Sequence, residues 1–166
     1  MLAGCSRSAA VPGAAAHPAS AQQHAQIEQI REQLDLIPPP SKNRYMAVRS
    51  LSAWENPYLT VQDGMLTLHV TVADANPSNL GVGGILRPVA ARRQDLNIRT
   101  GDLGIALNAV PQTAWPYGRV IAIEEAHDTP PSARPQMRRN MEAAMQSLND
   151  LGIVVYEWSD SGSTLR

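Results

Sequence analysis

The residues best suited to chemistry gather where an apolar run late in the chain ends. Val120-Ile121-Ala122-Ile123 is followed at once by Glu124, Glu125, His127 and Asp128. A histidine beside carboxylates is able to bind a metal or to act as general acid and base. The spacing matches no ligand motif such as His-Glu-x-x-His, and acidic residues often simply lead a strand into solvent. We therefore keep His127, Glu124 and Glu125 as catalytic candidates, with a solvated strand end as the plainer interpretation.

His69 is a fourth catalytic candidate, in the middle of an alternating segment between two threonines. It is able to meet His127 in space, although a surface histidine paired across strands is the simpler explanation. Gly81-Val82-Gly83-Gly84 lacks the Lys-Ser/Thr ending of a phosphate loop, and no Gly-x-Ser-x-Gly motif is present. The sequence thus predicts no metal and no cofactor. A hydrolase that uses the His/Glu cluster stays an alternative function.

A second group of candidates consists of aromatic residues beside prolines, which often serve as exposed anchors for partners. They are Trp54 and Tyr58, in Trp-Glu-Asn-Pro-Tyr, and Trp115 and Tyr117, in Trp-Pro-Tyr. The chain has no phenylalanine, so the same residues are equally suited to close the core as lids. We favour the lid interpretation and keep the anchor hypothesis beside it.

A third group of candidates is basic. Arg134, Arg138 and Arg139 are able to hold an anionic partner such as the wall polymer, although a solvated helix face explains them too. The whole chain has 14 basic and 15 acidic residues and a formal net charge of −1, so no long-range field attracts nucleic acid. We expect a protein or wall polymer as partner and no nucleic acid.

The only cysteine, Cys5, ends the string Leu2-Ala3-Gly4-Cys5. A single cysteine excludes an internal disulfide framework and a Cys-based zinc site. The string resembles the lipobox of bacterial lipoproteins, in which a signal peptidase cuts before the cysteine and the thiol takes a diacylglyceryl group. This resemblance implies lipidation of Cys5, a membrane anchor and a place on the periplasmic side of the cell envelope. Ser6 in place of Asp resembles outer-membrane retention in a diderm.

No charged and apolar signal segment precedes Leu2. We therefore expect that the natural start lies upstream or that the sequence is trimmed, and we regard residues 1–5 as the lipobox remnant of a signal peptide. Residues 6–22 are rich in Ala, Ser and Pro and predict a flexible stalk, and residues 159–166 predict a loose tail.

Residues 23–40 predict an amphipathic helix, Gln23 to Ile37, followed by the stiff spacer Pro38-Pro39-Pro40. Its apolar stripe is Ile27, Ile30, Leu34 and Ile37. The stripe packs on the domain or pairs with a second copy in a coiled coil. With only two heptads the first is preferred, and a homo-oligomer stays a partner hypothesis.

Residues 45–158 predict one α+β domain. Tyr58–Gln62 and Met65–Ala73 are separated by Asp63-Gly64, which predicts a hairpin whose two turn residues have positive φ. Residues 85–98 show no clear pattern. The remaining elements are a helix at 102–110 capped by Thr100 or Asp102, a central strand at 118–125, a helix from Arg134 or Pro135 to Leu151, and a strand at 153–158. A crossover helix makes the last two strands parallel, so we expect a small mixed sheet with an N-terminal hairpin, a C-terminal β-α-β unit and helices on one face.

Over residues 56–158 this order of elements resembles the periplasmic domain of the ExbD/TolR proteins, which couple the proton gradient to envelope machines. The resemblance is carried by the hairpin at Asp63-Gly64, the helix near 102–110, the strand Val120 to Ile123 and the turn Leu148-x-x-Leu151-Gly152-Ile153. The sequence holds no membrane helix with that family's proton-carrying aspartate. The resemblance therefore implies a scaffold that dimerises or touches the cell wall. We expect a lipid-anchored envelope binding or scaffold protein.

Overall fold

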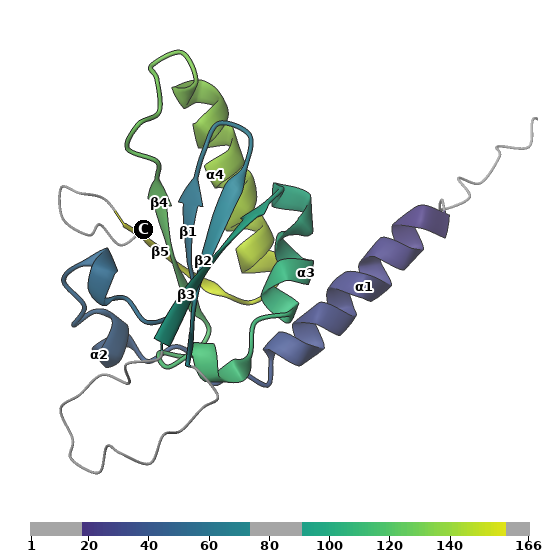
Figure 1. Ribbon diagram of the computed structural model, residues 1–166. Coiled ribbons are helices and arrows are strands. Elements are labelled where there is room, and N and C mark those ends of the chain that lie inside the picture. Colours follow the sequence, from purple (N-terminus) through teal and green to yellow (C-terminus); the bar gives the residue numbers. More distant parts are fainter. Residues whose placement is uncertain (1–17, 74–90, 159–166) are drawn as a thin grey trace, which may run out of the picture.

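The computed structural model describes residues 18–73 and 91–158, which form one mixed five-stranded sheet in the order β3-β2-β1-β4-β5 (Figure 1). β1 (Tyr58–Val61) pairs antiparallel with β2 (Leu66–Ala73) and parallel with β4 (Val120–Glu125). β3 (Ala91–Ile98) extends the sheet antiparallel to β2, and β5 (Val154–Glu157) lies parallel to β4. The α+β class, the hairpin and the parallel C-terminal pair are therefore confirmed. Cys5, Gly81–Gly84 and the predicted tail lie outside the described residues.

α3 (Leu103–Asn108) and α4 (Arg134–Asp150) lie over one face of this sheet, and α1 (Pro18–Leu34) packs against α3 (Figure 1). The apolar stripe of α4 is buried against β1, β2 and β4, as its spacing predicts; it consists of Met137, Met141, Ala144 and Leu148. Gly152 ends this helix region with a φ of 73°, which a glycine adopts without strain. The C-terminal β-α-β unit is thus built as expected.

The apolar stripe of α1 packs on the domain. Ile30, Leu34 and Ile37 are buried in the same core, whereas Ile27 is 45% exposed. The helix begins at Pro18 and ends at Leu34, so the predicted stalk is too long and the predicted helix end too late. Helix starts in a sequence rich in alanine are hard to place because alanine suits both a helix and a flexible segment.

The predicted proline spacer is wrong, because the prolines are part of the domain. The backbone N–H of Arg119 donates to the Pro38 carbonyl oxygen at 2.9 Å, and that of Ser41 donates to the Tyr117 carbonyl oxygen at 2.9 Å. The approach is close enough that a Cβ at Gly118 would lie 2.4 Å from the Pro39 carbonyl oxygen. These tertiary contacts fix the proline segment on the domain.

The opposite face of the sheet is covered by Tyr45 at the end of α2 (Lys42–Tyr45) and by Trp54 directly after the 3-10 helix Leu51–Ala53. The sequence pattern does not predict these two short helices. Tyr45, Trp54 and Tyr117 join Tyr58 and Tyr156 of the sheet in a second core. Trp54 stacks on Tyr156 with ring centroids 5.5 Å apart and an interplanar angle of 11°. Part of the sheet is therefore buried on both faces.

Two local predictions are wrong. Gly64 has no positive φ, so the hairpin turn is not the type that Asp-Gly favours. A tertiary contact holds it instead, since the Asn140 side chain of α4 donates to the Asp63 carbonyl oxygen at 2.6 Å. Asp102 precedes α3 but makes no side-chain capping bond, because the 3-10 turn Thr100–Asp102 runs directly into the helix.

Candidate functional site

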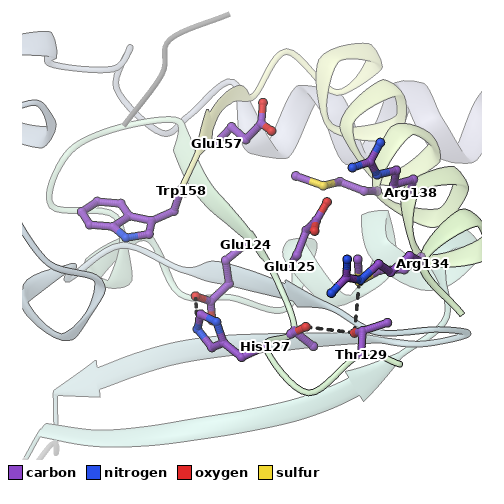
Figure 2. Close-up of a pocket in the computed structure, with 11 residues that line it drawn as sticks. Glu124, Glu125, His127, Thr129, Arg134, Arg138, Glu157 and Trp158 are labelled. Carbon is purple, nitrogen blue, oxygen red and sulfur yellow. Dashed lines mark hydrogen bonds and ion pairs between the residues drawn. The ribbon is translucent and has the colours of Figure 1, made fainter. Parts of the chain in front are cut away.

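A groove of about 370 Å³ lies at the C-terminal ends of β4 and β5, beside the first turns of α4 (Figure 2). Its polar lining comes from all three elements and consists of Glu124, Glu125, His127, Thr129, Arg134, Arg138 and Glu157. Met137, Met141 and Trp158 supply its apolar lining. The groove therefore brings together three of the four catalytic candidates and two of the three arginines expected to hold an anion.

The topology of the sheet explains why these residues meet. The carboxyl ends of parallel strands lie at one edge of a sheet, and the following helix starts at the same edge. The chain leaves β4 through Ala126, whose N–H donates to the Val61 carbonyl oxygen at 2.9 Å. The Thr129 hydroxyl closes the turn by donating to the Ala126 carbonyl oxygen at 2.9 Å. The groove is thus framed by a fixed turn and a packed helix.

Arg134 and Arg138 lie on the helix side of the groove, with the Glu125 carboxylate on the strand side (Figure 2). In the described part of the chain neither guanidinium forms an ion pair. Arg139 does not line the groove, and its guanidinium donates to the Gln136 side chain at 2.7 Å. The structure therefore separates the three predicted arginines into two that face the groove and one that does not.

His127 and Glu124 form a loose pair at the mouth of the groove. His127 Nε2 lies 3.9 Å from Glu124 Oε2, and the histidine side chain is 65% exposed whereas that of Glu124 is 16% exposed. The other oxygen of this carboxylate, Oε1, accepts a hydrogen bond from the Thr60 hydroxyl at 2.8 Å. Glu124 is therefore held from the sheet and faces His127 with its remaining oxygen.

His69 lies outside the groove but reaches Glu124 through Thr60. Its Nε2 is 3.0 Å from Thr60 Oγ1, and its Nδ1 is 2.6 Å from Asp95 Oδ1. The result is a hydrogen-bonded row across four strands, from Asp95 on β3 to Glu124 on β4. The Tyr58 ring stacks on the imidazole at 4.2 Å and fixes its orientation. The predicted cross-strand pairing of His69 is thus found, with Asp95 as partner.

Searches among known protein families, curated proteins and solved structures found no match. Within residues 18–73 and 91–158, no three His, Cys, Asp or Glu side chains are placed to hold a metal ion. None of the helices in these ranges is long and apolar enough to cross a membrane. The function has to be argued from the chemistry of the groove and of the row across the sheet.

The aromatic candidates do not form an exposed anchor surface, so the anchor hypothesis is wrong. Trp54, Tyr58, Trp115 and Tyr117 are 2%, 7%, 4% and 8% exposed. Burial raises the pKa of Tyr58 and Tyr117 above the ordinary value of 10.0. All four rings close the two cores, which is the lid interpretation. Large aromatic rings stabilise a core through the apolar area that they bury.

Sequence reasoning missed Thr60, Glu157 and Trp158. Thr60 matters because it lies directly opposite Glu124 in the parallel β1–β4 register. Its sequence signal was the alternation within β1, which puts Thr60 on the same face as Tyr58. Glu157 and Trp158 join the groove only because β5 lies beside β4, and neither has a motif of its own.

Proposed function

We propose that this chain is a lipid-anchored binding protein of the cell envelope that holds its partner in the groove beside α4. The observation that carries the binding function is that Arg134 and Arg138 open onto a concave site and, within residues 18–73 and 91–158, form no ion pair. The proposed localisation rests on the resemblance of Leu2-Ala3-Gly4-Cys5 to a lipobox. The ExbD/TolR-like order of elements is consistent with a binding role and adds no chemistry.

The chemistry of arginine supports this proposal. A planar guanidinium forms two parallel hydrogen bonds to a carboxylate or phosphate, so two of them on adjacent helix turns suit an anionic group. The apolar floor beneath them includes Met137, which is 1% exposed, and Met141, which is 6% exposed. Charged groups above an apolar floor of this kind are typical of small-ligand sites.

The proposed lipid anchor and localisation are tested by metabolic labelling. Cells that produce the natural protein are supplied with an alkyne-tagged fatty acid. We expect the label on the protein and its recovery with membranes, and both should be lost in Cys5→Ala. Recovery of unlabelled wild-type protein in the soluble fraction would reject the lipid anchor.

The binding function is tested by capture from envelope extracts with the full chain. A partner recovered by the wild type should be lost with Arg134→Gln/Arg138→Gln and retained with Arg139→Gln, a matched change on the same helix outside the groove. Equal recovery by all three proteins would reject the groove as the binding site. Trp115→Ala is unsuited as a probe, since Trp115 is buried in the core.

The row Asp95–His69–Thr60 favours a hydrolase as the second candidate function. A hydroxyl next to a histidine that is itself oriented by a carboxylate is the arrangement of an activated nucleophile. Thr60 also lines a depression of about 430 Å³ next to the groove, together with His127. In this scheme the Thr60 hydroxyl first breaks its bond to Glu124 Oε1 and turns to His69 Nε2. Oγ1 then attacks an ester carbonyl, its proton passes to His69 Nε2 and then to the leaving alcohol, and water releases the acid.

An activated ester tests this candidate. The intact mass of the chain should increase by one acyl group at Thr60, and the adduct should be absent in Thr60→Val and in His69→Gln. Thr67→Val is the matched control, since Thr67 is the neighbouring threonine on the same face and bonds Asn97 instead. An adduct that persists in Thr60→Val would exclude the hydrolase.

A further inference from the structure

The groove carries negative as well as positive charge. Glu125 and Glu157 line it together with Arg134 and Arg138, and in the described residues neither glutamate forms an ion pair. Figure 2 shows the Glu125 carboxylate pointing toward the arginine side. A purely anionic partner would be attracted by the helix and repelled by the strand ends. The two arginines alone therefore do not determine which ligand the groove selects.

We infer that the groove takes a short zwitterionic peptide, with its carboxylate against Arg134 and Arg138 and its ammonium group against Glu125 and Glu157. This rests on the proposed binding function and names its ligand class. Such a ligand satisfies both charged walls at once. A ligand with one charge pairs with one wall only and meets like charge on the other, so a site of this kind discriminates against it.

The size of the groove sets the length of the peptide. A volume of about 370 Å³ lies near the lower end of the range for small-ligand sites, roughly 300–1,000 Å³. One or two residues with both charged ends fill such a space, whereas a polymer enters it only by an end or a short branch.

The apolar lining of the groove accommodates the side chain of the ligand. Met137 and Met141 form the floor. The Trp158 ring packs instead on Trp54 and Tyr156 and points away from the arginines (Figure 2). Methionine side chains adapt to ligands of different shape. A small apolar side chain between the two charges, such as the methyl group of alanine, fits this surface.

Alanyl dipeptides with and without blocked ends test the inference on the full chain by isothermal titration calorimetry. We expect L-alanyl-L-alanine or D-alanyl-D-alanine to bind at least about tenfold tighter than the N-acetylated anion or the amidated cation. Preference for the D form would assign the ligand to free dipeptides released from wall peptides, and preference for the L form to free dipeptides released from proteins.

Variants on both walls complete the test. Arg138→Gln and Glu157→Gln should each weaken dipeptide binding by about tenfold. Arg139→Gln and Glu142→Gln, exposed changes on α4 outside the groove, should leave it unchanged. These substitutions replace solvent-accessible side chains, and unchanged thermal unfolding shows that each variant is folded.

Two results overturn the inference. One is equal affinity for the free and the N-acetylated dipeptide, and the other is no measurable binding of any of them. Both leave the proposed binding function standing if capture of an envelope partner still depends on Arg134 and Arg138. If partner capture does not depend on Arg134 and Arg138 while dipeptide binding is intact, the envelope function is rejected and the ligand class is retained.

Discussion

The buried Asn56 side chain donates a hydrogen bond to the Gly118 carbonyl oxygen at 2.8 Å, across 62 residues of sequence. The same amide nitrogen donates to the Val120 carbonyl oxygen at 2.7 Å, and its oxygen accepts from the Tyr117 N–H at 2.8 Å. Asn56 is 1% exposed. One amide therefore fixes the start of β1 against the start of β4 and sets the parallel pairing on which the groove depends.

Asn56→Ala is expected to lower the free energy of unfolding by about 2–4 kcal/mol, because it leaves buried backbone groups without partners. Urea denaturation followed by circular dichroism measures the loss. Asn149→Ala, an exposed change in the last turn of α4, is the control and should stay within about 0.5 kcal/mol of the wild type. A similar loss in both variants would argue against the role of Asn56.

Gly118→Ala is expected to cost about 3 kcal/mol or more. Gly118 has a φ of 83°, and an added Cβ would lie within 2.8 Å of the carbonyl groups of Pro38 and Pro39. Gly64→Ala is the matched control, since nothing lies within 4 Å of its added Cβ. Thermal unfolding of the two variants should differ clearly, and equal midpoints would contradict the close contact at Gly118.

Elements with a periodic apolar pattern could be predicted from the sequence. The stripe of α4 and the alternation of β2 each bury one face, and that burial is what the pattern records. β3 could not be predicted, because Arg92 to Leu96 are exposed and carry no alternation. This strand exists through its backbone pairing with β2, which is a tertiary effect.

The cluster of Glu124, Glu125 and His127 at the strand end was predicted as one candidate site, but the arginines of α4 were predicted separately from it. His127 and Arg138 were each chosen for their chemistry, but no pattern indicated that they line one groove. Their meeting depends on the β4–α4–β5 crossover, and the link from His69 to Glu124 depends on the register of β1 between β2 and β4. Distances across a sheet follow from topology, which a single sequence indicates only coarsely.

Leu34→Ala is expected to destabilise the domain by about 2–5 kcal/mol, because Leu34 is 2% exposed in the main core. Ile27→Ala on the same stripe of α1 should cost less than about 1 kcal/mol, because Ile27 is 45% exposed. Chemical denaturation measures both. Sedimentation of Ile27→Ala also tests the coiled-coil alternative, which requires a change in oligomeric state.

Alkaline pH is expected to destabilise the fold through its buried tyrosines. Burial raises the pKa of Tyr45, Tyr58 and Tyr117 above 10.0, so the unfolded chain loses these protons first. Their contribution is complete below pH 10.0 and is lost as the pH rises through the folded-state pKa values. Phenolate absorbance should show these residues titrating above 10.0 in the folded chain and near 10.0 in denaturant. Coincident curves would contradict the expectation.

Glu124 belongs to both the groove and the row across the sheet, with one oxygen turned to each. The groove and the hydrogen-bonded row across the sheet are therefore thermodynamically linked. A ligand that draws the carboxylate toward the groove weakens its bond to Thr60 and leaves that hydroxyl to His69. By reciprocity, a ligand of the groove and a ligand bound at Thr60 change each other's affinity by the same free energy. The loss of groove affinity caused by changing Arg138 and that caused by changing His69 should therefore not be additive.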